Sequence, residues 1–325
     1  MIDLLGLRIL VTLDEEGTVT ATAARLGYSP SNVTQHLRRI EGTLGMPMVE
    51  RVGRRVVLTQ RAQDLATRGR PLLLEIDDLA ASTMQEPSGT IDIGAFPTAT
   101  RGLLLPAMAA LGREHPDLTV ELHELEPLPA LEAVRSGRIH AAIVKTWGSA
   151  EDPEDTILTR IPLGRDPIDV LVPSDHPLAD AEYVHFHDLR DQVWALTPAG
   201  EPSYRVWFSS HQKAPALRPR RIYEASEFTS LVSFVAHGLA ITAIPRLGRA
   251  PLPQGVVAVP LRHANAFRSI SLAVRRTSQG SVSIQALLHA LRAVTWATGD
   301  ETPLTWSASR PSTDRADFAE LPVDL

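Results

Sequence analysis

The chain has 325 residues, of which 44% are hydrophobic and 22% charged, with a formal net charge of −6. These values are typical of a globular protein of two or three domains, and they exclude a largely disordered chain and a membrane protein. The absence of cysteine excludes disulfides and thiolate zinc sites. The apolar start carries Asp3 and lacks both a basic beginning and a small-residue cleavage site, so we expect a cytoplasmic location.

The charge is distributed unevenly along the chain. Residues 19–61 hold seven arginines and two acids, whereas residues 299–325 hold six acids and two arginines. A basic module on an acidic protein is typical of a DNA-binding domain joined to another domain. The proline-rich acidic tail, 299–325, shows no periodicity and is expected to be disordered.

Residues 1–58 predict three short helices followed by a hairpin. The first helix ends at Gly17, the second is rich in alanine and ends at Gly27, and the third begins at Ser29 and Pro30. Ser29 is a suitable N-cap, and proline fits the first helical position. One apolar stripe along the third helix is formed by Val33, Leu37, Ile40 and Leu44.

The rest of that third helix is polar and basic. In isolation such a surface most often indicates only a solvated helix, but the tight turn before it makes a helix-turn-helix. Residues 48–59 then alternate as a hairpin would, with arginines at the tip to grip phosphates as a wing. The predicted DNA-binding residues are Ser31, Asn32, Thr34, Gln35, Arg38, Arg39, Arg51, Arg54 and Arg55.

These motifs together resemble the winged helix-turn-helix of the LysR-type transcriptional regulators. The resemblance rests on residues 7–59, above all on Ala23-Ala24-Arg25-Leu26, Ile40-Glu41, Glu50-Arg51 and Leu58-Thr59. It implies a double-stranded DNA operator, a homodimer or homotetramer, and contact with RNA polymerase. The family often has Gln-Pro after the serine, whereas here Pro30 comes first and Ser31-Asn32 follow, so the operator cannot be inferred from relatives.

Residues 59–87 predict one long helix, capped by Thr59 and ending near Pro87. Leu65, Leu72 and Leu79 recur every seven residues with Ile76 between them, as a helix-pairing seam requires. The alternative is a helix packed on its own domain; the resemblance makes it the dimerisation helix. Pro71 removes a hydrogen bond inside this segment, and we expect a kink or break at residues 67–71.

From residue 88 to 298, strand and helix patterns alternate, which predicts a mainly parallel sheet. This part is similar to the effector-binding domain of the same family, and the pieces that carry the similarity are residues 91–111, 115–122, 131–144, 171–179 and 234–246. The similarity implies an α/β fold of two lobes, of the type 2 periplasmic-binding-protein kind. Lobe I is expected at 88–163 and 265–298, and lobe II at 164–264.

The sequence lacks the motifs of an enzyme. It contains no G-x-S-x-G elbow, phosphate-binding loop, dinucleotide glycine motif or H-E-x-x-H pattern, so we expect no catalysis and no cofactor. His185 and His187 alternate along a predicted strand and suggest a metal site, but no third ligand accompanies them. Exposed strand or loop histidines are the more common explanation, so no metal site is predicted.

A small-molecule site is expected where the first strand of lobe I ends. Ligands of open α/β sheets bind beyond the carboxyl ends of strands. The predicted effector-binding residues, several of them implied by the resemblance, are Phe96, Thr98, Thr100, Arg101, Trp147, Thr197, Ser226 and Phe228. Helix capping is the alternative role for Thr100 and Ser226. Arg101 and the threonines favour an anion, whereas Glu126, Glu224 and Glu227 would favour a cationic or neutral ligand.

The sequence thus predicts a DNA-binding transcriptional regulator modulated by a small-molecule effector. Two alternatives stay open at this point. In the first, the second domain binds no ligand and serves only in oligomerisation. In the second, the chain is a solute-binding protein, and the basic N-terminal module argues against this.

Overall fold

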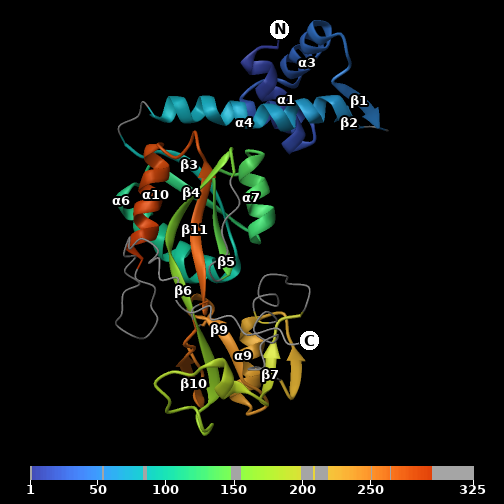
Figure 1. Cartoon of the computed structure of the whole chain (residues 1–325). Helices are drawn as coiled ribbons and strands as arrows, with labels where there is room; N and C mark the ends of the chain where they lie inside the picture. The colour runs from blue at the N-terminus through green and yellow to red at the C-terminus, as the bar shows by residue number, and fades with distance from the viewer. Residues whose placement is uncertain are drawn as a thin grey trace, which may run out of the picture.

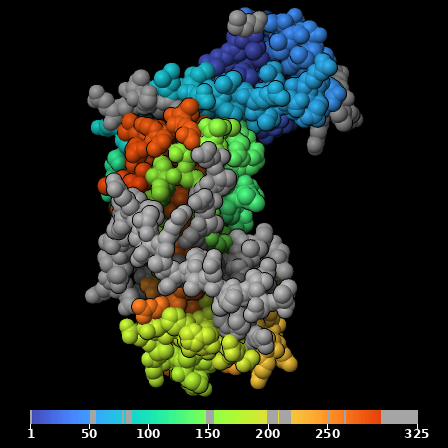
Figure 2. All heavy atoms as spheres, viewed as in Figure 1, coloured from blue at the N-terminus to red at the C-terminus, as the bar shows by residue number. Residues whose placement is uncertain are grey.

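A computed structural model describes residues 2–52, 55–82, 86–147, 155–198, 208, 219–249, 251–263 and 265–294. A helical module, a long helix and two α/β lobes follow one another along the molecule (Figure 1). The space-filling view shows the module and the long helix set at one end, against lobe I (Figure 2). The tail 299–325 lies outside the described residues. Within the described ranges, no helix is long and apolar enough to cross a membrane.

The N-terminal module contains α1 (Leu4–Glu16), α2 (Val19–Leu26), α3 (Pro30–Leu44) and the hairpin of β1 (Val49–Val52) and β2 (Arg55–Leu58). Each helix begins at a side-chain cap and ends at a left-handed glycine; the caps are Asp3, Thr18 and Ser29. The Ser29 cap and the ends at Gly17 and Gly27 were predicted from the sequence. Val33, Leu37 and Ile40 are buried against α1 residues. The Glu41 carboxylate accepts a hydrogen bond of 2.9 Å from the N–H of Met48, which fastens the hairpin to α3.

Helix α4 (Gln60–Ser82) runs unbroken through Pro71, so a break at residues 67–71 is wrong, while the kink that was its alternative stays a prediction. Thr59 caps it, accepting from the N–H of Ala62 at 3.3 Å. On one side Arg70 is buried and pairs with Asp14 and Glu15 of α1. Lobe I lies on the other side, where the backbone at Gly137 faces Pro71. Because neighbours hold the helix on both sides, the single hydrogen bond that proline removes does not end it.

Lobe I is a sheet with helices on both faces. Its strands are β3 (Gly89–Ala95), β4 (Leu118–Glu124), β5 (Ala141–Trp147), the first part of β6 (Leu158–Pro173) and most of β11 (Phe267–Arg275). Side chains of α6 (Leu105–Glu114) and α10 (Val282–Ala293) fill the core on one face. Helix α7 (Pro127–Arg135) covers the other face.

Lobe II is built on the second part of β6. That part pairs with β9 (Thr242–Pro245) and β10 (Val256–Pro260), while β7 (Val193–Leu196) and β8 (Arg221–Glu224) form a separate parallel pair. Helix α9 (Phe228–Ala236) and the short turns η2 (Phe186–Leu189) and η3 (Arg246–Gly248) complete the described part of this lobe.

The large sheet is not mainly parallel, which corrects the expectation. Strands β4, β3 and β5 are parallel, but β5–β11, β11–β6, β6–β10 and β6–β9 are antiparallel. The reason is that β6 and β11 return along the sheet and connect the two lobes (Figure 1). At Pro167 and Ile168, β6 exchanges its partner β11 for β9, so the two-strand ribbon forms a hinge between the lobes.

Candidate effector pocket and DNA-binding surface

The polar face of α3 is open to solvent. Ser31, Gln35, Arg38 and Arg39 are exposed, while Asn32 and Thr34 are half-buried. The Thr34 hydroxyl donates to the backbone oxygen of Pro30 at 2.8 Å, and the hydroxyls of Ser31 and Ser29 are 2.9 Å apart. Gln35 and Arg38 therefore present polar groups that no described contact already occupies.

The wing is a β-hairpin in the predicted place. Arg51 pairs with Val56 in the register of the two strands, and Val52 pairs with Arg55. Arg54 lies outside the described residues, and only the backbone of Arg51 and Arg55 is described. The hairpin fold supports the predicted wing, while the contacts of its three arginines stay a prediction.

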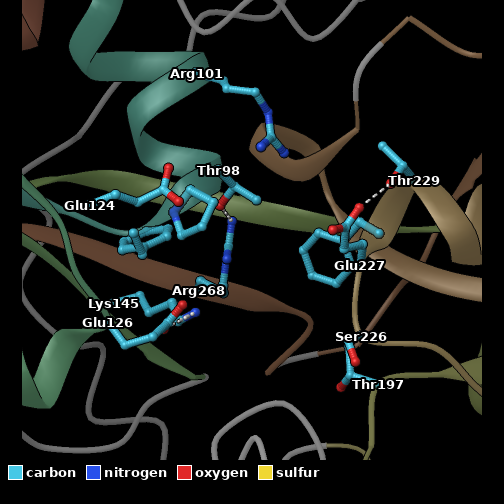
Figure 3. Close-up of a pocket in the computed structure, with 13 residues that line it drawn as sticks. Thr98, Arg101, Glu124, Glu126, Lys145, Thr197, Ser226, Glu227, Thr229 and Arg268 are labelled. Atoms are coloured by element: carbon cyan, nitrogen blue, oxygen red, sulfur yellow. Dashed lines mark hydrogen bonds and ion pairs between the residues drawn. The ribbon is translucent and has the colours of Figure 1, made fainter.

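A cavity of about 340 Å³ lies between the lobes, at the end of β3 (Figure 3). Lobe I contributes the segment after β3 and the ends of β4 and β5. Lobe II contributes the end of β7 and the start of α9. The lining residues are Phe96, Pro97, Thr98, Arg101, Glu124, Glu126, Lys145, Thr197, Ser226, Glu227, Phe228, Thr229 and Arg268.

Arg268 forms the floor of this cavity and is only 1% exposed. Its guanidinium makes an ion pair with Asp166, its register partner on β6, and donates to the Thr98 hydroxyl at 3.1 Å. Asp166 also accepts from the N–H of Leu247, in η3 of lobe II, at 3.0 Å. Burial raises the pKa of the Asp166 carboxyl, and Arg268 opposes that shift. One buried network thus joins the loop of lobe I, the hinge and lobe II.

The other charges of the cavity divide into a paired and an unpaired set. Lys145 lies 3.2 Å from the Glu126 carboxylate and 4.7 Å from the centre of the Phe96 ring. Among the described residues, Arg101 and Glu124 make no ion pair, and the Glu227 carboxylate accepts only from the Thr229 hydroxyl, at 3.1 Å. Counting only contacts among the described residues, the cavity keeps one cation and two carboxylates for a ligand.

The Thr197 side chain adds an unsatisfied group. Its hydroxyl is buried at the end of β7, lines the cavity, and has no hydrogen-bond partner within the described part of the chain. A buried hydroxyl without a partner costs about 1–3 kcal/mol, which a bound polar ligand would offset.

Six of the eight predicted effector residues line the cavity, and two do not. Thr100 is buried at the start of a π-helical turn, Thr100–Leu104, and its hydroxyl has no partner among the described residues. Trp147 packs against the core of lobe II, with its ring 5.5 Å from the Arg268 guanidinium. Neither Thr100 nor Ser226 makes a capping hydrogen bond in the described contacts.

Sequence reasoning missed Lys145, Glu124 and Arg268, and it placed Glu224 at a cleft that it does not line. The only hint of Arg268 in the sequence was weak: an arginine at the start of a strand whose other residues are mostly buried. His185 and His187 lie at the start of η2 rather than on a strand; their rings stack at 5.2 Å, and His187 contacts Asp188 at 3.3 Å.

Helix α4 shows where the predicted seam residues lie. Leu72, Ile76 and Leu79 are 54%, 41% and 70% exposed, whereas Leu65 packs against the core of the N-terminal module. Leu65 is therefore packed within its own chain, whereas Leu72, Ile76 and Leu79 form an apolar row on the surface.

Comparison with known proteins places these two parts in one family. The family model of the LysR substrate binding domain matches residues 84–296, and that of the bacterial regulatory helix-turn-helix protein, lysR family, matches residues 4–63. The chain belongs to the LysR family. Members with this pair of domains are transcriptional regulators. The LysR-type fold and the family membership predicted from the sequence are therefore confirmed.

Named relatives cover nearly the whole chain. The HTH-type transcriptional regulator BenM of Acinetobacter baylyi is 27% identical over 309 residues, which is 94% of this chain and 100% of BenM. The DNA-binding transcriptional dual regulator OxyR of Escherichia coli is 27% identical over 292 residues, or 88% of this chain and 94% of OxyR.

Solved structures agree with the fold. A full-length OxyR from Pseudomonas aeruginosa aligns with a TM-score of 0.73 at 21% identity, covering 95% of this chain and 99% of that one. The BenM effector-binding domain with its effector benzoate aligns with a TM-score of 0.57 at 26% identity, covering 68% of this chain and 98% of that one. This LysR-family protein is thus a DNA-binding transcriptional regulator with an effector-binding domain that modulates it.

Proposed function

We propose that the effector of this LysR-family regulator binds in the cavity between the lobes and carries both a carboxylate and an amine. The observation that supports the proposal is the charge left over inside the cavity. The Lys145–Glu126 and Arg268–Asp166 pairs neutralise themselves, and Arg101 remains opposite Glu124 and Glu227. A purely anionic ligand would meet two unneutralised carboxylates, so the anionic effector expected from the sequence fits this balance poorly.

The positions of these groups suggest an orientation for the ligand. Thr98 lies in the short helix α5 (Pro97–Ala99) and Arg101 in the π-helical turn Thr100–Leu104, both in lobe I, whereas Glu227 is the N-cap of α9 in lobe II (Figure 3). A carboxylate held by lobe I and an ammonium held by lobe II would bridge the lobes. Such a ligand binds the closed arrangement better than the open one, and only a difference of this kind shifts a conformational equilibrium.

Two other functions fit less well. The ligand-free alternative predicts a cleft filled by side chains, whereas the cavity measures about 340 Å³. Some relatives are named as hydrogen peroxide-inducible genes activators. The 325 residues here contain no cysteine, so they carry no thiol that peroxide would oxidise.

We further propose a homodimer joined along α4, through the exposed Leu72, Ile76 and Leu79. Two copies of α3 related by a two-fold axis would then read a symmetric, interrupted operator. In this proposal Ser31, Asn32 and Gln35 reach base edges, while the arginines of α3 and the wing contact phosphates.

The test of the effector is a binding screen with matched probes. Each amino acid is compared, by thermal shift and calorimetry, with the acid that lacks its amine and with the amine that lacks its carboxylate. We expect a hit only among the compounds that carry both groups. Arg101→Ala and Glu227→Gln should each weaken that hit, whereas Arg113→Ala, an exposed arginine of α6 outside the cavity, should not. A hit that the lone acid reproduces, or that both pocket variants leave unchanged, would overturn the proposal.

A further inference from the structure

A second cluster of ionisable side chains lies outside the effector cavity, at the edge of the lobe I sheet. Asp92 is on β3, and Glu121 and His123 are on β4, which ends the sheet. Leu118, Val120 and Leu122 of β4 pack into the core between the sheet and α6. Because side chains alternate along a strand, Glu121 and His123 lie together on the opposite face.

The three side chains are close enough to share one ion. Their donor atoms all lie within 4.8 Å of one another, and His123 Nε2 is 3.1 Å from an Asp92 carboxylate oxygen. Metal–ligand bonds of about 2.0–2.2 Å at tetrahedral angles place neighbouring ligand atoms about 3.3–3.6 Å apart. At 3.1 Å the Asp92–His123 pair is slightly closer than two ligands would be, so this pair has to open a little and the exposed Glu121 side chain has to rotate inward.

The charges of the cluster favour a cation. Asp92 and Glu121 are direct partners in the parallel register, and like charges opposite each other destabilise a sheet. Arg25 on α2 does not neutralise this pair, because its guanidinium is bound by Glu16 at 2.8 Å and Glu15 at 3.5 Å.

An outer partner holds the Asp92 segment in place. The Nδ1 atom of His140 accepts a hydrogen bond of 2.9 Å from the Asp92 N–H and lies 3.2 Å from its carboxylate. Contact with His140 lowers the pKa of the Asp92 carboxyl, and His123 adds a smaller effect. Metal-binding carboxylates are commonly fixed by such partners, which orient the ligand oxygen.

We propose that Asp92, Glu121 and His123 form a binding site for one divalent transition-metal ion, with zinc as the best match. Two carboxylates and one imidazole balance the charge of the ion, and such mixed oxygen and nitrogen ligands suit zinc better than calcium or magnesium. Water fills the remaining coordination positions, since the site faces solvent. None of the three residues lines the effector cavity, so this site is separate from it.

The site is tested by calorimetry of untagged, chelator-treated protein with zinc chloride. We expect one zinc ion per chain. His123→Ala and Glu121→Gln should each weaken binding more than about tenfold, since even the outer partners of a metal site are worth 10–100-fold. Both side chains are exposed, so neither change threatens the fold.

A matched control removes another exposed histidine beside an acid. His187→Ala, next to Asp188, should leave zinc binding unchanged. Visible absorption of the cobalt-loaded protein gives a second readout, because His123→Ala should alter the bands and His187→Ala should not. Zinc affinity that is equal in wild type and His123→Ala, or that is lost only in His187→Ala, would overturn the proposal.

Discussion

Single residues at chain junctions contribute stability that depends on pH, and Asp155 shows this most directly. Its carboxylate accepts from the backbone N–H groups of Leu158 at 3.0 Å and Ile157 at 2.8 Å, and from Arg135 of α7 at 2.6 Å. These contacts, with that to Leu158 the largest, lower the pKa of Asp155 from 3.8 to about 2. Asp155 therefore stabilises the native state above pH 4, and this contribution is lost as the pH falls from about 4 to about 2.

We predict that Asp155→Asn destabilises the effector domain at pH 7 by about 1 kcal/mol, less than the full pKa shift implies because solvent screens the pair with Arg135. Urea unfolding at several pH values measures the free energy of unfolding of both proteins. The difference between wild type and variant should shrink below pH 4. Asp180→Asn, which alters an exposed carboxylate of lobe II, should show no such trend. A constant difference from pH 7 to pH 2 would contradict the assignment.

The buried pair at the hinge leads to a second prediction. Arg268→Met leaves the Asp166 carboxylate buried without its cation, which should cost about 3–5 kcal/mol of unfolding free energy. Asp166→Leu combined with Arg268→Met removes both charges and should recover most of that loss. Denaturant unfolding of the two variants measures both free energies of unfolding. If the double variant is as unstable as the single one, the pair acts through packing rather than through charge.

At the scale of elements, α3 predicts how the protein reads DNA. Gln35→Ala should weaken binding to the operator by about 1–3 kcal/mol and leave binding to scrambled duplexes unchanged, because a base contact is lost and no phosphate contact. Titrations on both duplexes at two salt concentrations measure the difference, with the operator first selected from random sequences. Gln279→Ala, an exposed glutamine of lobe I, serves as the control. Equal losses on both duplexes would remove Gln35 from the reading surface.

Helix α4 carries the prediction for oligomerisation. Leu72→Glu should dissociate the dimer, because a charge would enter an apolar row buried between two copies. Leu128 on α7 is a matched control, since it is 76% exposed but lies off the row. Sedimentation should show monomers for Leu72→Glu and the wild-type state for Leu128→Glu. A Leu72→Glu protein that keeps its oligomeric state would place the interface elsewhere.

The sequence predicts elements with a local signal and misses those without one. The glycines at 17 and 27 identify the ends of α1 and α2, and the Ser29 cap and the apolar stripe identify α3, because each of these signals acts within its own turn or helix. The first part of β6 was missed because Pro162, Gly164 and Pro167 argue against a strand. The structure accommodates them beside an irregularity in the β11 register, at Ile270 and Ser271. The loop after β3 was predicted, but Arg268 was not, since its partner Asp166 is 102 residues away.

At the scale of the whole molecule, a single turn sets how the long helix meets lobe I. Gly137, which follows α7, has a φ of +73°. A Cβ atom there would lie 2.8 Å from the Leu74 side chain and 3.3 Å from the Pro71 nitrogen. Both contacts belong to α4, so a larger residue would push the helix and the DNA-binding module away from the lobe that senses the effector.

We therefore predict that Gly137→Ala weakens the coupling between effector and operator, beyond the cost of strain. The left-handed backbone alone costs an alanine about 1–2 kcal/mol. Gly255→Ala isolates that cost, because Gly255 has a φ of +84° and no atom within 4 Å of the added Cβ. Both variants should lose similar stability from strain. Only Gly137→Ala should change the small-angle scattering profile and reduce the effect of ligand on operator affinity. Identical behaviour of the two variants would show that the contact between α4 and lobe I does not transmit the signal.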